Sequence, residues 1–310
     1  MKLLFVVNPI SGGVDKEPFL KEVKALCEKY GIAYFIFKTT GQNDEENLQK
    51  LLPVQKPDKV VSVGGDGTTL FTALALLDSG YPMGIIPQGS ANGMATELFV
   101  NPKPIEALKD IIMSERIEGL DILKVNDEHY TMHIGDVGVN AQIVESYEKD
   151  PNRGMATYAK YFLDELRRLK PFPVSVHANG ESYYEKALMV GICNARKYGT
   201  GVPLNVEGNP MDGKFELVLV NRISTSSLLK AGLAKFDDSF HDSQASRLIV
   251  TEYAEIEFDE PRLLQLDGEV IGKFDKIKVE MLKGAVKFIT HGNNIYLKLI
   301  NFKCLKQDIH

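Results

Sequence analysis

The sequence has few cysteines, no surplus of positive charge and no long apolar run. Its 310 residues include three cysteines, far apart and odd in number, which indicates neither a disulfide framework nor a CxxC metal site and fits a reducing cytosol. The net charge of −6 argues against the basic field that nucleic-acid binding usually needs. No 18 consecutive apolar residues occur, and the apolar start of the chain is too short for a signal peptide. We therefore expect a cytoplasmic protein without a nucleic-acid partner.

Two motifs that commonly bind nucleotides are missing as well. The sequence contains neither GxxxxGKS nor GxxxxGKT, so no lysine is assigned in advance to the phosphates of a nucleotide. The first apolar run, residues 3–7, is not followed by GxGxxG, which argues against a dinucleotide-dependent dehydrogenase. Any nucleotide site in this chain must therefore be built from other loops.

Strand and helix patterns alternate through the first third of the chain. Strand-like apolar runs occupy residues 3–7, 33–37, 59–63 and 83–86. Helical spacing of apolar residues occupies 18–30, 45–52, 70–77 and 104–113. This alternation predicts a parallel sheet with helices on both faces.

The pattern changes after about residue 117. Most later segments are strand-like, at residues 121–125, 130–134, 173–177, 187–192, 215–220, 247–250, 254–258, 263–266, 277–279 and 285–289, while 155–169 and 226–234 look helical. Alternation and β-branched residues favour an antiparallel sandwich. We therefore expect one domain at residues 1–117 and a second at 118–310, with a last strand, 294–300, returning to the first domain.

Glycine-containing loops follow three of the predicted strands: NPISGG at residues 8–13, GGDGTT at 64–69 and PQGSAN at 87–92. In an open α/β sheet, ligands bind at the carboxyl ends of the strands, and amides of such loops bind phosphate. Asp66 in the second loop would repel a bare phosphate, so it fits if a divalent cation bridges the two or if it accepts a proton. Each loop taken alone is equally explained as a tight turn.

Six short motifs occur in order along the chain: NPISG (8–12), GGDGT (64–68), GSANGMA (89–95), GDVGVNA (135–141), DGKFE (212–216) and LDGE (266–269). Together they resemble the diacylglycerol kinase catalytic-domain family, which includes sphingosine kinases and bacterial lipid kinases. The resemblance covers nearly the whole chain. It implies an α/β N-terminal domain with a phosphofructokinase/NAD kinase-like parallel sheet, and a mostly antiparallel β-sandwich C-terminal domain. It also implies transfer of the γ-phosphoryl group of ATP, with Mg²⁺, to a hydroxyl of a diacylglycerol-like or sphingoid lipid.

Two alternative functions stay open. NAD kinases carry a related GGDGT loop, but they continue with a GINxGxLGFL-like stretch and an Asn-Glu pair. This chain has GIIPQGS at residues 84–90 and no Asn-Glu dipeptide, which favours the lipid-kinase branch over an NAD kinase-like phosphotransferase. The other alternative is a nucleotide-sensing protein that keeps the loops but has no turnover.

By resemblance, ATP lies among the three glycine loops. Thr40 is as close a candidate as Thr39 for the position after the second strand, and Ser90 stands where the family usually has threonine. Asn8 and Ser11 are equally explained as turn formers. The residues implied to bind the nucleotide are Asn8, Pro9, Ser11, Gly12, Thr39, Gly64, Gly65, Asp66, Gly67, Thr68, Gly89, Ser90 and Asn92.

Two carboxylates are candidates for the catalytic base. A lipid hydroxyl is a poor nucleophile near neutral pH, and a positioned carboxylate can accept its proton during phosphoryl transfer. The resemblance points to Glu269 in bacterial members and to the GGDGT aspartate, Asp66, in sphingosine kinases. Without the resemblance, Asp267-Gly268 would indicate an ordinary hairpin turn.

The loop NPMDGK at residues 209–214 resembles a loop that holds a structural magnesium in bacterial members, largely through backbone carbonyls, which implies Asn209, Asp212 and Lys214 as the counterparts here. An ordinary turn explains the same loop. Asn140 departs from the family, which usually has an aspartate there, and the missing charge bears on substrate or domain contacts.

The segment at residues 153–170 has five basic and two acidic residues, interleaved with aromatic and aliphatic ones. It fits a helix that rests on an anionic membrane, and it equally fits a solvated helix with an aromatic core stripe. By resemblance, the partner is a lipid substrate at the membrane surface, so we expect a transient peripheral location. A homodimer is compatible with the sequence.

Overall fold

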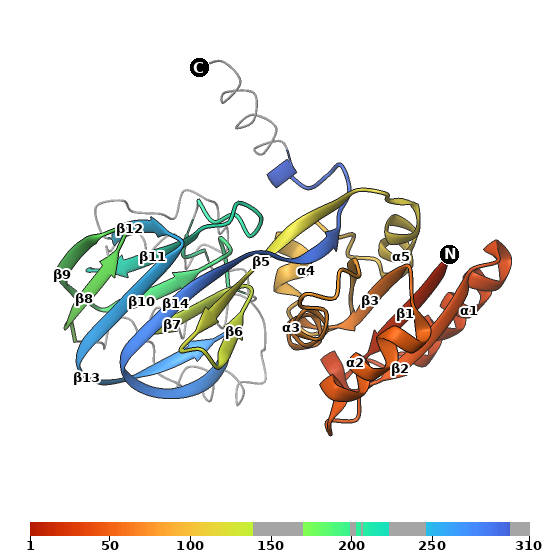
Figure 1. Ribbon diagram of the computed structural model, residues 1–310, viewed down its shortest axis with the longest axis horizontal. Helices are drawn as coiled ribbons and strands as arrows, with labels where there is room; N and C mark the ends of the chain where they lie inside the picture. The colour runs from red at the N-terminus through yellow and green to blue at the C-terminus, as the bar shows by residue number, and fades with distance from the viewer. Residues whose placement is uncertain (139–169, 199–202, 206, 223–245, 298–310) are drawn as a thin grey trace, which may run out of the picture. The chain divides into compact units, whose positions relative to one another are not determined.

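The computed structural model describes residues 1–138, 170–198, 203–205, 207–222 and 246–297 (Figure 1). The chain divides into two compact units. The first unit comprises Met1–Leu120 and Gly284–His310, and the second unit comprises Asp121–Lys283. Strands β5 (Ile117–Val125) and β14 (Glu269–Ile289) each contribute residues to both units.

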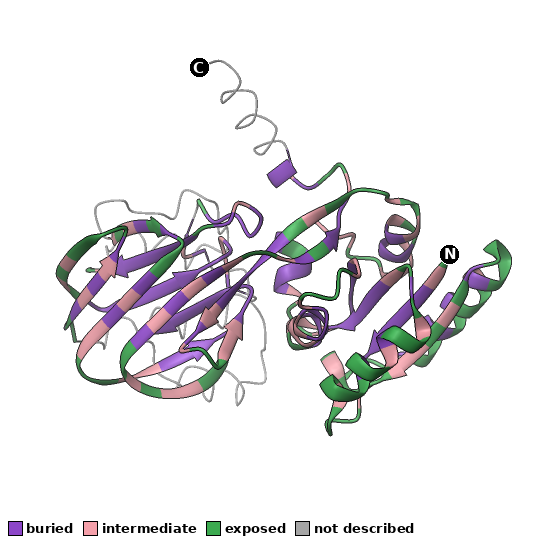
Figure 2. Ribbon diagram, viewed as in Figure 1, coloured by how far each residue is buried: buried purple, intermediate pink, exposed green. Residues whose placement is uncertain are grey.

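The sheet of the first unit is parallel. Its strands lie in the order β2 (Ala33–Lys38), β1 (Lys2–Val7), β3 (Lys59–Gly64) and β4 (Met83–Pro87). The end of β14 adds to β4 in parallel, with Phe288 opposite Met83. The apolar runs of β1, β3 and β4 are almost wholly buried (Figure 2), as expected for parallel strands covered on both faces. The predicted α/β class is confirmed.

Helices follow the strands as the alternation predicts. They are α1 (Glu17–Tyr30), α2 (Asp44–Gln55), α3 (Asp66–Ala75), α4 (Gly93–Glu97) and α5 (Pro104–Met113), with a short 3-10 turn at Ser11–Gly13. Proline in the first turn of α1 and of α5 removes an amide that has no helical acceptor. Gly31 ends α1 in the left-handed conformation, with φ of 64°.

The second unit is antiparallel. Its strands are parts of β5 and β14, together with β6 (His129–Thr131), β7 (Ile134–Val137), β8 (Phe172–Ala178), β9 (Glu181–Ala187), β10 (Met189–Cys193), β11 (Phe215–Val220), β12 (Ser246–Thr251) and β13 (Tyr253–Leu266). The main order is β12-β11-β10-β7-β13-β14, while β8 pairs with both β13 and β9. The predicted antiparallel class of this unit is confirmed.

Three details of the second unit differ from the prediction. The runs at 254–258 and 263–266 form one strand, β13, with an irregular register between Glu257 and Arg262. The runs at 277–279 and 285–289 are both parts of β14. Strand β9 was not predicted, although the turn before it, Asn179-Gly180, has the positive φ angles of a tight hairpin, 56° and 77°.

The predicted last strand is wrong in its described part. Residues 294–297 form no strand: a turn at Ile295 is followed by helical backbone at Tyr296 and Leu297, and the Leu297 amide donates to the Asn294 carbonyl at 3.4 Å. The strand that pairs with the sheet of the first unit is the end of β14 instead. The helices predicted at 155–169 and 226–234 lie outside the described residues. None of the helices that the structure describes is long and apolar enough to cross a membrane.

Each unit has its own hydrophobic core. In the first unit, alternate residues of β1, including Phe5, pack against buried residues of α1 and α5 such as Val23 and Leu108. In the second unit, residues of β8, β10, β11 and β13 form the core around Phe215 and Ile256. These cores hold the strand ends, and so the loops that follow them, in fixed positions.

Candidate functional site

The three glycine loops of the first unit meet at Gly89. A Cβ atom on Gly89 would lie 2.2 Å from the Gly65 Cα, and one on Gly12 would lie 2.9 Å from the Gly89 carbonyl carbon. Real Cβ atoms essentially never approach closer than 3.0 Å, so no side chain fits at these contacts. Gly12 also has φ of 64°, which favours glycine. The loops after β1, β3 and β4 therefore pack backbone against backbone.

Asn92 closes the third loop. Its Oδ1 accepts from the Gly89 amide at 2.7 Å, and its Nδ2 donates to the Gly89 carbonyl at 3.0 Å. Asn92 has φ of 54°, a left-handed conformation that asparagine adopts more readily than most residues. Ser90, between them in sequence, is exposed. Asn92 therefore shapes the loop, whereas Ser90 presents its hydroxyl to solvent.

Asp66 links the second loop to helix α4. Its Oδ2 accepts from the Gly93 amide at 2.8 Å, and its Oδ1 accepts from the Met94 amide at 2.9 Å. A carboxylate at the N-terminus of a helix satisfies amides that have no helical acceptor. Both oxygens of Asp66 thus hold the start of α4. The sequence predicts a role for Asp66 as base or beside a cation and does not predict this structural contact.

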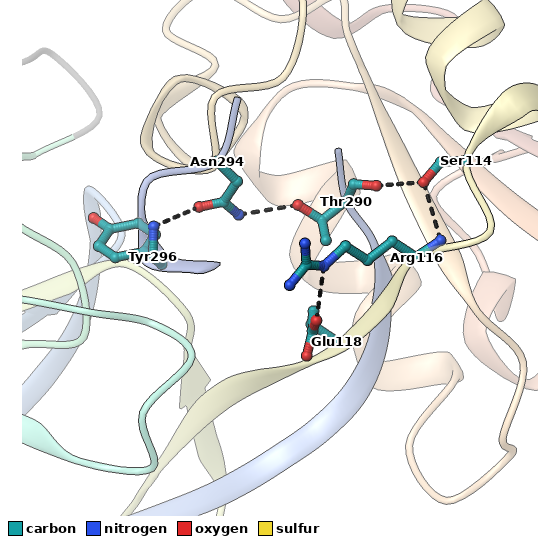
Figure 3. A network of polar contacts seen from close by, with 6 residues as sticks. All are labelled: Ser114, Arg116, Glu118, Thr290, Asn294 and Tyr296. Atoms are coloured by element: carbon teal, nitrogen blue, oxygen red, sulfur yellow. Dashed lines mark hydrogen bonds and ion pairs between the residues drawn. The ribbon is translucent and has the colours of Figure 1, made fainter. Parts of the chain in front are cut away.

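The other end of α4 is held by the segment after β14. The Tyr296 hydroxyl donates to the Glu97 carboxylate, and both side chains are buried. Asn294 accepts from the Tyr296 amide at 3.0 Å and donates to the Thr290 hydroxyl at 3.1 Å (Figure 3). Helix α4 is therefore fixed at its start by Asp66 and at its end by Tyr296.

An open pocket of about 330 Å³ lies beside the first two glycine loops. Small-molecule sites commonly have volumes of about 300–1,000 Å³. The pocket is lined by Asn8, Pro9, Ile10, Thr39, Thr40, Gly41, Asp44, Gly67, Thr68 and Phe71. It therefore brings together five of the predicted nucleotide residues, and both candidate threonines contribute to it.

The other predicted nucleotide residues do not line this pocket. Gly12, Gly65 and Gly89 form the backbone contacts between the loops. Ser11 braces the first loop, since its hydroxyl donates to the carbonyls of Asn8 and Gln88 at 3.2 and 3.3 Å. These residues therefore hold the loops that form the pocket and do not line it.

The start of helix α3 offers donors to an anion. The first amides of a helix have no helical acceptor, and here they belong to the segment that contributes Gly67 and Thr68 to the pocket. The Thr68 hydroxyl is buried and has no hydrogen-bond partner among the described residues. A Cβ atom on Gly64 would lie 2.3 Å from this hydroxyl oxygen, so glycine makes room for it. The initial amides of α3 fit the phosphates of a nucleotide, whereas the buried Thr68 hydroxyl occupies the space that Gly64 leaves.

Asp44 is a pocket residue that the sequence did not single out. Its carboxylate accepts from the Thr40 amide at 2.9 Å, the Gly41 amide at 2.6 Å and the Thr40 hydroxyl at 2.9 Å. Partial burial raises the pKa of this carboxyl, but the three hydrogen bonds outweigh burial and leave the pKa below its usual value. Asp44 thereby fixes the loop after β2 at the pocket wall.

In the second unit, the LDGE motif forms the hairpin turn between β13 and β14. Asp267 and Gly268 have φ of 49° and 90°, and Leu266 pairs with Glu269 across the turn. Positive φ at both central positions is what a type I′ turn requires, and Asp-Gly favours it. The turn interpretation of this dipeptide is confirmed.

The two carboxylates of this motif have different surroundings. Asp267 accepts from the Thr131 hydroxyl at 2.5 Å and from the Ile134 amide at 3.2 Å, which ties the turn to β6 and β7. Glu269 is exposed at the first position of β14. Of this pair, Glu269 is therefore the carboxylate exposed to solvent, while its role as base stays a prediction.

The loop at residues 209–214 is bound largely to itself and to β5. The Asn209 side-chain oxygen accepts from the Met211 amide at 3.1 Å, and the Asp212 carboxylate accepts from the Lys214 amide at 3.2 Å. The Gly213 amide donates to Asp121 Oδ2 at 2.7 Å. The described residues contain no group of three or more His, Cys, Asp or Glu side chains placed to hold a metal ion. The implied magnesium would be held largely by backbone carbonyls, which these side-chain contacts do not test, so the assignment stays a prediction.

The described part of the motif at residues 135–141 lies in and after β7. Asp136 is buried and accepts from the Tyr198 hydroxyl and the Gln265 amide group, both at 3.2 Å. This carboxylate joins β7 to β13. Asn140 and most of the basic segment at 153–170 lie outside the described residues.

Two family models match the chain. The diacylglycerol kinase catalytic domain matches residues 2–125. The YegS C-terminal NAD kinase beta sandwich-like domain matches residues 134–290. The chain belongs to the bacterial diacylglycerol kinase and YegS-like family. The resemblance seen in the six motifs is thereby confirmed.

Relatives of this family cover most of the chain. The protein named "Probable lipid kinase YegS-like" from Pectobacterium atrosepticum is 27% identical over 290 residues, which are 91% of this chain and 94% of that protein. The crystal structure of a diacylglycerol kinase from Bacillus anthracis has a TM-score of 0.71 at 22% identity, covering 94% of this chain and 98% of that one. An NAD kinase from Archaeoglobus fulgidus in complex with ATP has a TM-score of 0.56 at 15% identity, covering 97% and 98%. Both structures show a shared fold, including the NAD kinase-like architecture.

Proposed function

We propose that this protein is an ATP-dependent lipid kinase that transfers the γ-phosphoryl group to a hydroxyl of a diacylglycerol-like or sphingoid lipid. The observation that carries the proposal is the pocket of the first unit. Its lining includes Gly67 and Thr68 at the amide-rich start of α3, within the region that matches the diacylglycerol kinase catalytic domain. Membership of a kinase family supports ATP as the donor.

In this proposal, the first unit binds the nucleotide. Gly67 and Thr68 donate to the phosphates from the start of α3, and Asn8 and Thr39 contact the nucleotide from the other two segments of the pocket wall. Asp66 keeps α4 and its loop in place. Bound MgATP supplies the phosphoryl group together with a divalent cation that neutralises developing charge.

The second unit supplies the base. The lipid hydroxyl oxygen forms the new bond to the γ-phosphorus, the bond to the bridging oxygen of ADP breaks, and Glu269 accepts the hydroxyl proton. The exposure of Glu269 supports this role, because its carboxylate does not need to break an internal contact to reach an acceptor. To reach a membrane lipid, the protein docks transiently at the membrane surface. Its net charge of −6 opposes docking on an anionic bilayer.

The test is phosphate transfer from radiolabelled ATP into a total-lipid extract, followed by identification of the product. Parallel reactions contain NAD in place of lipid, or a chelator that removes Mg²⁺. We expect a labelled lipid, no labelled NADP and no transfer with the chelator. Labelled NADP would establish the NAD kinase-like alternative. Stabilisation by ATP without transfer to any acceptor would establish a nucleotide sensor.

A further inference from the structure

Lys16 is a buried lysine beside the glycine loops, and the nucleotide pocket described above does not include it. Its side chain is 3% exposed. The ammonium donates to the carbonyl of Ser11 at 2.6 Å, of Val14 at 3.0 Å and of Gln88 at 2.9 Å. A lysine is almost never fully buried unless its ammonium has partners, and here all three donors of the group are used.

These three carbonyls come from two different loops. Ser11 and Val14 belong to the segment between β1 and α1, whereas Gln88 follows β4. The Ser11 hydroxyl donates to the same Gln88 carbonyl, and the Gly12 backbone touches Gly89 beside it. Lys16 thus joins the first glycine loop to the third by hydrogen bonds, beside the Ser11 hydroxyl and the contact between Gly12 and Gly89.

The Lys16 ammonium is hydrogen-bonded by uncharged groups. All three of its hydrogen-bond partners are backbone carbonyls. Burial lowers the pKa of this ammonium, and the neighbouring Asp15 carboxylate partly offsets the effect.

We propose that Lys16 is a positioning residue for nucleotide binding: its ammonium holds the first and third glycine loops together and so keeps the nucleotide loops in place. This inference rests on the proposed use of a nucleotide. It assigns no contact between Lys16 and the nucleotide itself.

The chain contains a matched control in Lys59. The Lys59 ammonium also donates to three carbonyls, those of Ile111 at 2.8 Å, Ile112 at 3.3 Å and Ser114 at 2.8 Å. Burial lowers its pKa as well. These contacts tie β3 to the end of α5, and none of the four residues lines the nucleotide pocket. The two lysines therefore share their chemistry and differ in location.

The experiment measures the Kd of MgATP by calorimetry for the full-length wild type, Lys16→Met, Lys16→Arg and Lys59→Met, with urea unfolding of each. We expect Lys16→Met to bind MgATP at least about tenfold more weakly, equivalent to about 1.4 kcal/mol. Lys59→Met should unfold at lower urea but keep its MgATP affinity within about twofold. Lys16→Arg, which keeps the charge and several donors, should recover part of the loss.

In turnover, the KM for ATP should rise for Lys16→Met more than kcat falls, because the lysine does not touch the reacting atoms. If Lys16→Met does not fold, the comparison of Lys16→Arg with Lys59→Arg replaces it, and only the first should weaken MgATP binding. Equal affinities for wild type and Lys16→Met, or equal losses at both lysines, would overturn the positioning role alone. A wild type that does not bind MgATP would overturn the nucleotide proposal together with it.

Discussion

An Asp-Gly pair stands at the candidate site of each unit, and both aspartates accept hydrogen bonds from a second segment. Asp66 accepts hydrogen bonds from two amides at the start of α4, and Asp267 accepts hydrogen bonds from the Ile134 amide and the Thr131 hydroxyl. In both cases a carboxylate holds a second segment in place. Neither aspartate is therefore available without breaking internal hydrogen bonds.

The two pairs differ in the element to which they belong. Asp66 and Gly67 begin helix α3, whose initial amides have no helical acceptor, whereas Asp267 and Gly268 form the turn before strand β14, which begins with an exposed glutamate. A helix start is suited to binding phosphate, and a strand start presents one side chain at a defined position. The comparison teaches that the same dipeptide can begin a helix, whose first amides have no helical acceptor, in one unit and form a hairpin turn beside an exposed glutamate in the other, which is the difference that the proposed roles require.

The largest effect should come from Glu269→Gln, which removes the base and keeps the shape of the side chain. We expect turnover to fall by about 10²–10⁴-fold, the usual contribution of a general base, while MgATP affinity is unchanged. Lipid phosphorylation and calorimetry measure the two quantities. Asp275→Asn, at another exposed carboxylate of β14, is the control and should keep full turnover. Near-full activity of Glu269→Gln would remove the base assignment and leave the comparison with only its first half.

Gly89→Ala should have the next largest effect, and on the other unit. Its methyl group would lie 2.2 Å from the Gly65 Cα, so the second and third glycine loops must move apart. Backbone shifts of this kind cost about 1–3 kcal/mol, which predicts about 10–100-fold weaker MgATP binding. Gly292→Ala, where a Cβ atom meets nothing within 4 Å, should bind MgATP as the wild type does. An unchanged affinity of Gly89→Ala in calorimetry would show that the loop contact does not shape the nucleotide site.

The pair Asp66→Asn and Asp267→Asn tests the comparison directly. Each change weakens charge-assisted hydrogen bonds worth about 1.5–3 kcal/mol, so each should lower the urea midpoint. Only Asp66→Asn should also weaken MgATP binding, by about tenfold, because α4 and its loop belong to the nucleotide unit. If both variants, or neither, lost MgATP affinity in calorimetry, Asp66 and Asp267 would not have separate roles.

Much of the fold is specified by local sequence. Runs such as residues 3–7 and 59–63 are apolar throughout because parallel strands are buried on both faces, and their loops carry glycine where the backbones touch. The prediction divides the long strand β14 because Gly284, with φ of 56°, resembles a turn signal while it lies within the strand. The apolar residues after β14 suggest another strand. Tyr296 is buried against α4 instead, which only tertiary structure specifies.

The candidate site was predicted less completely. The glycines and Thr68 are recognisable by motif, but the motif does not separate residues that line the pocket from those that support it. Lys16 lies in a polar stretch that is typical of an exposed loop, and its burial depends on a carbonyl 72 positions away. Asp44 follows a glycine-containing turn, so the signal that identifies it is local: an acidic side chain that can accept from amides three and four residues earlier.

Asp44 should give the smallest effect, which is a change in how stability depends on pH. Its folded pKa lies below the ordinary value of 3.8, so its contribution to stability is complete above that pH and is lost as the pH falls through the folded pKa. We expect the urea midpoint of the wild type to drop more steeply below about pH 4 than that of Asp44→Asn, whose side chain does not titrate. The difference should be small because the carboxyl is near solvent. At neutral pH, Asp44→Asn should also bind MgATP more weakly than the wild type, since Thr40 and Gly41 lose their anchor at the pocket wall. Identical acid profiles for the two proteins would mean that this loop is held by other contacts and that the nucleotide unit depends on its glycine loops alone.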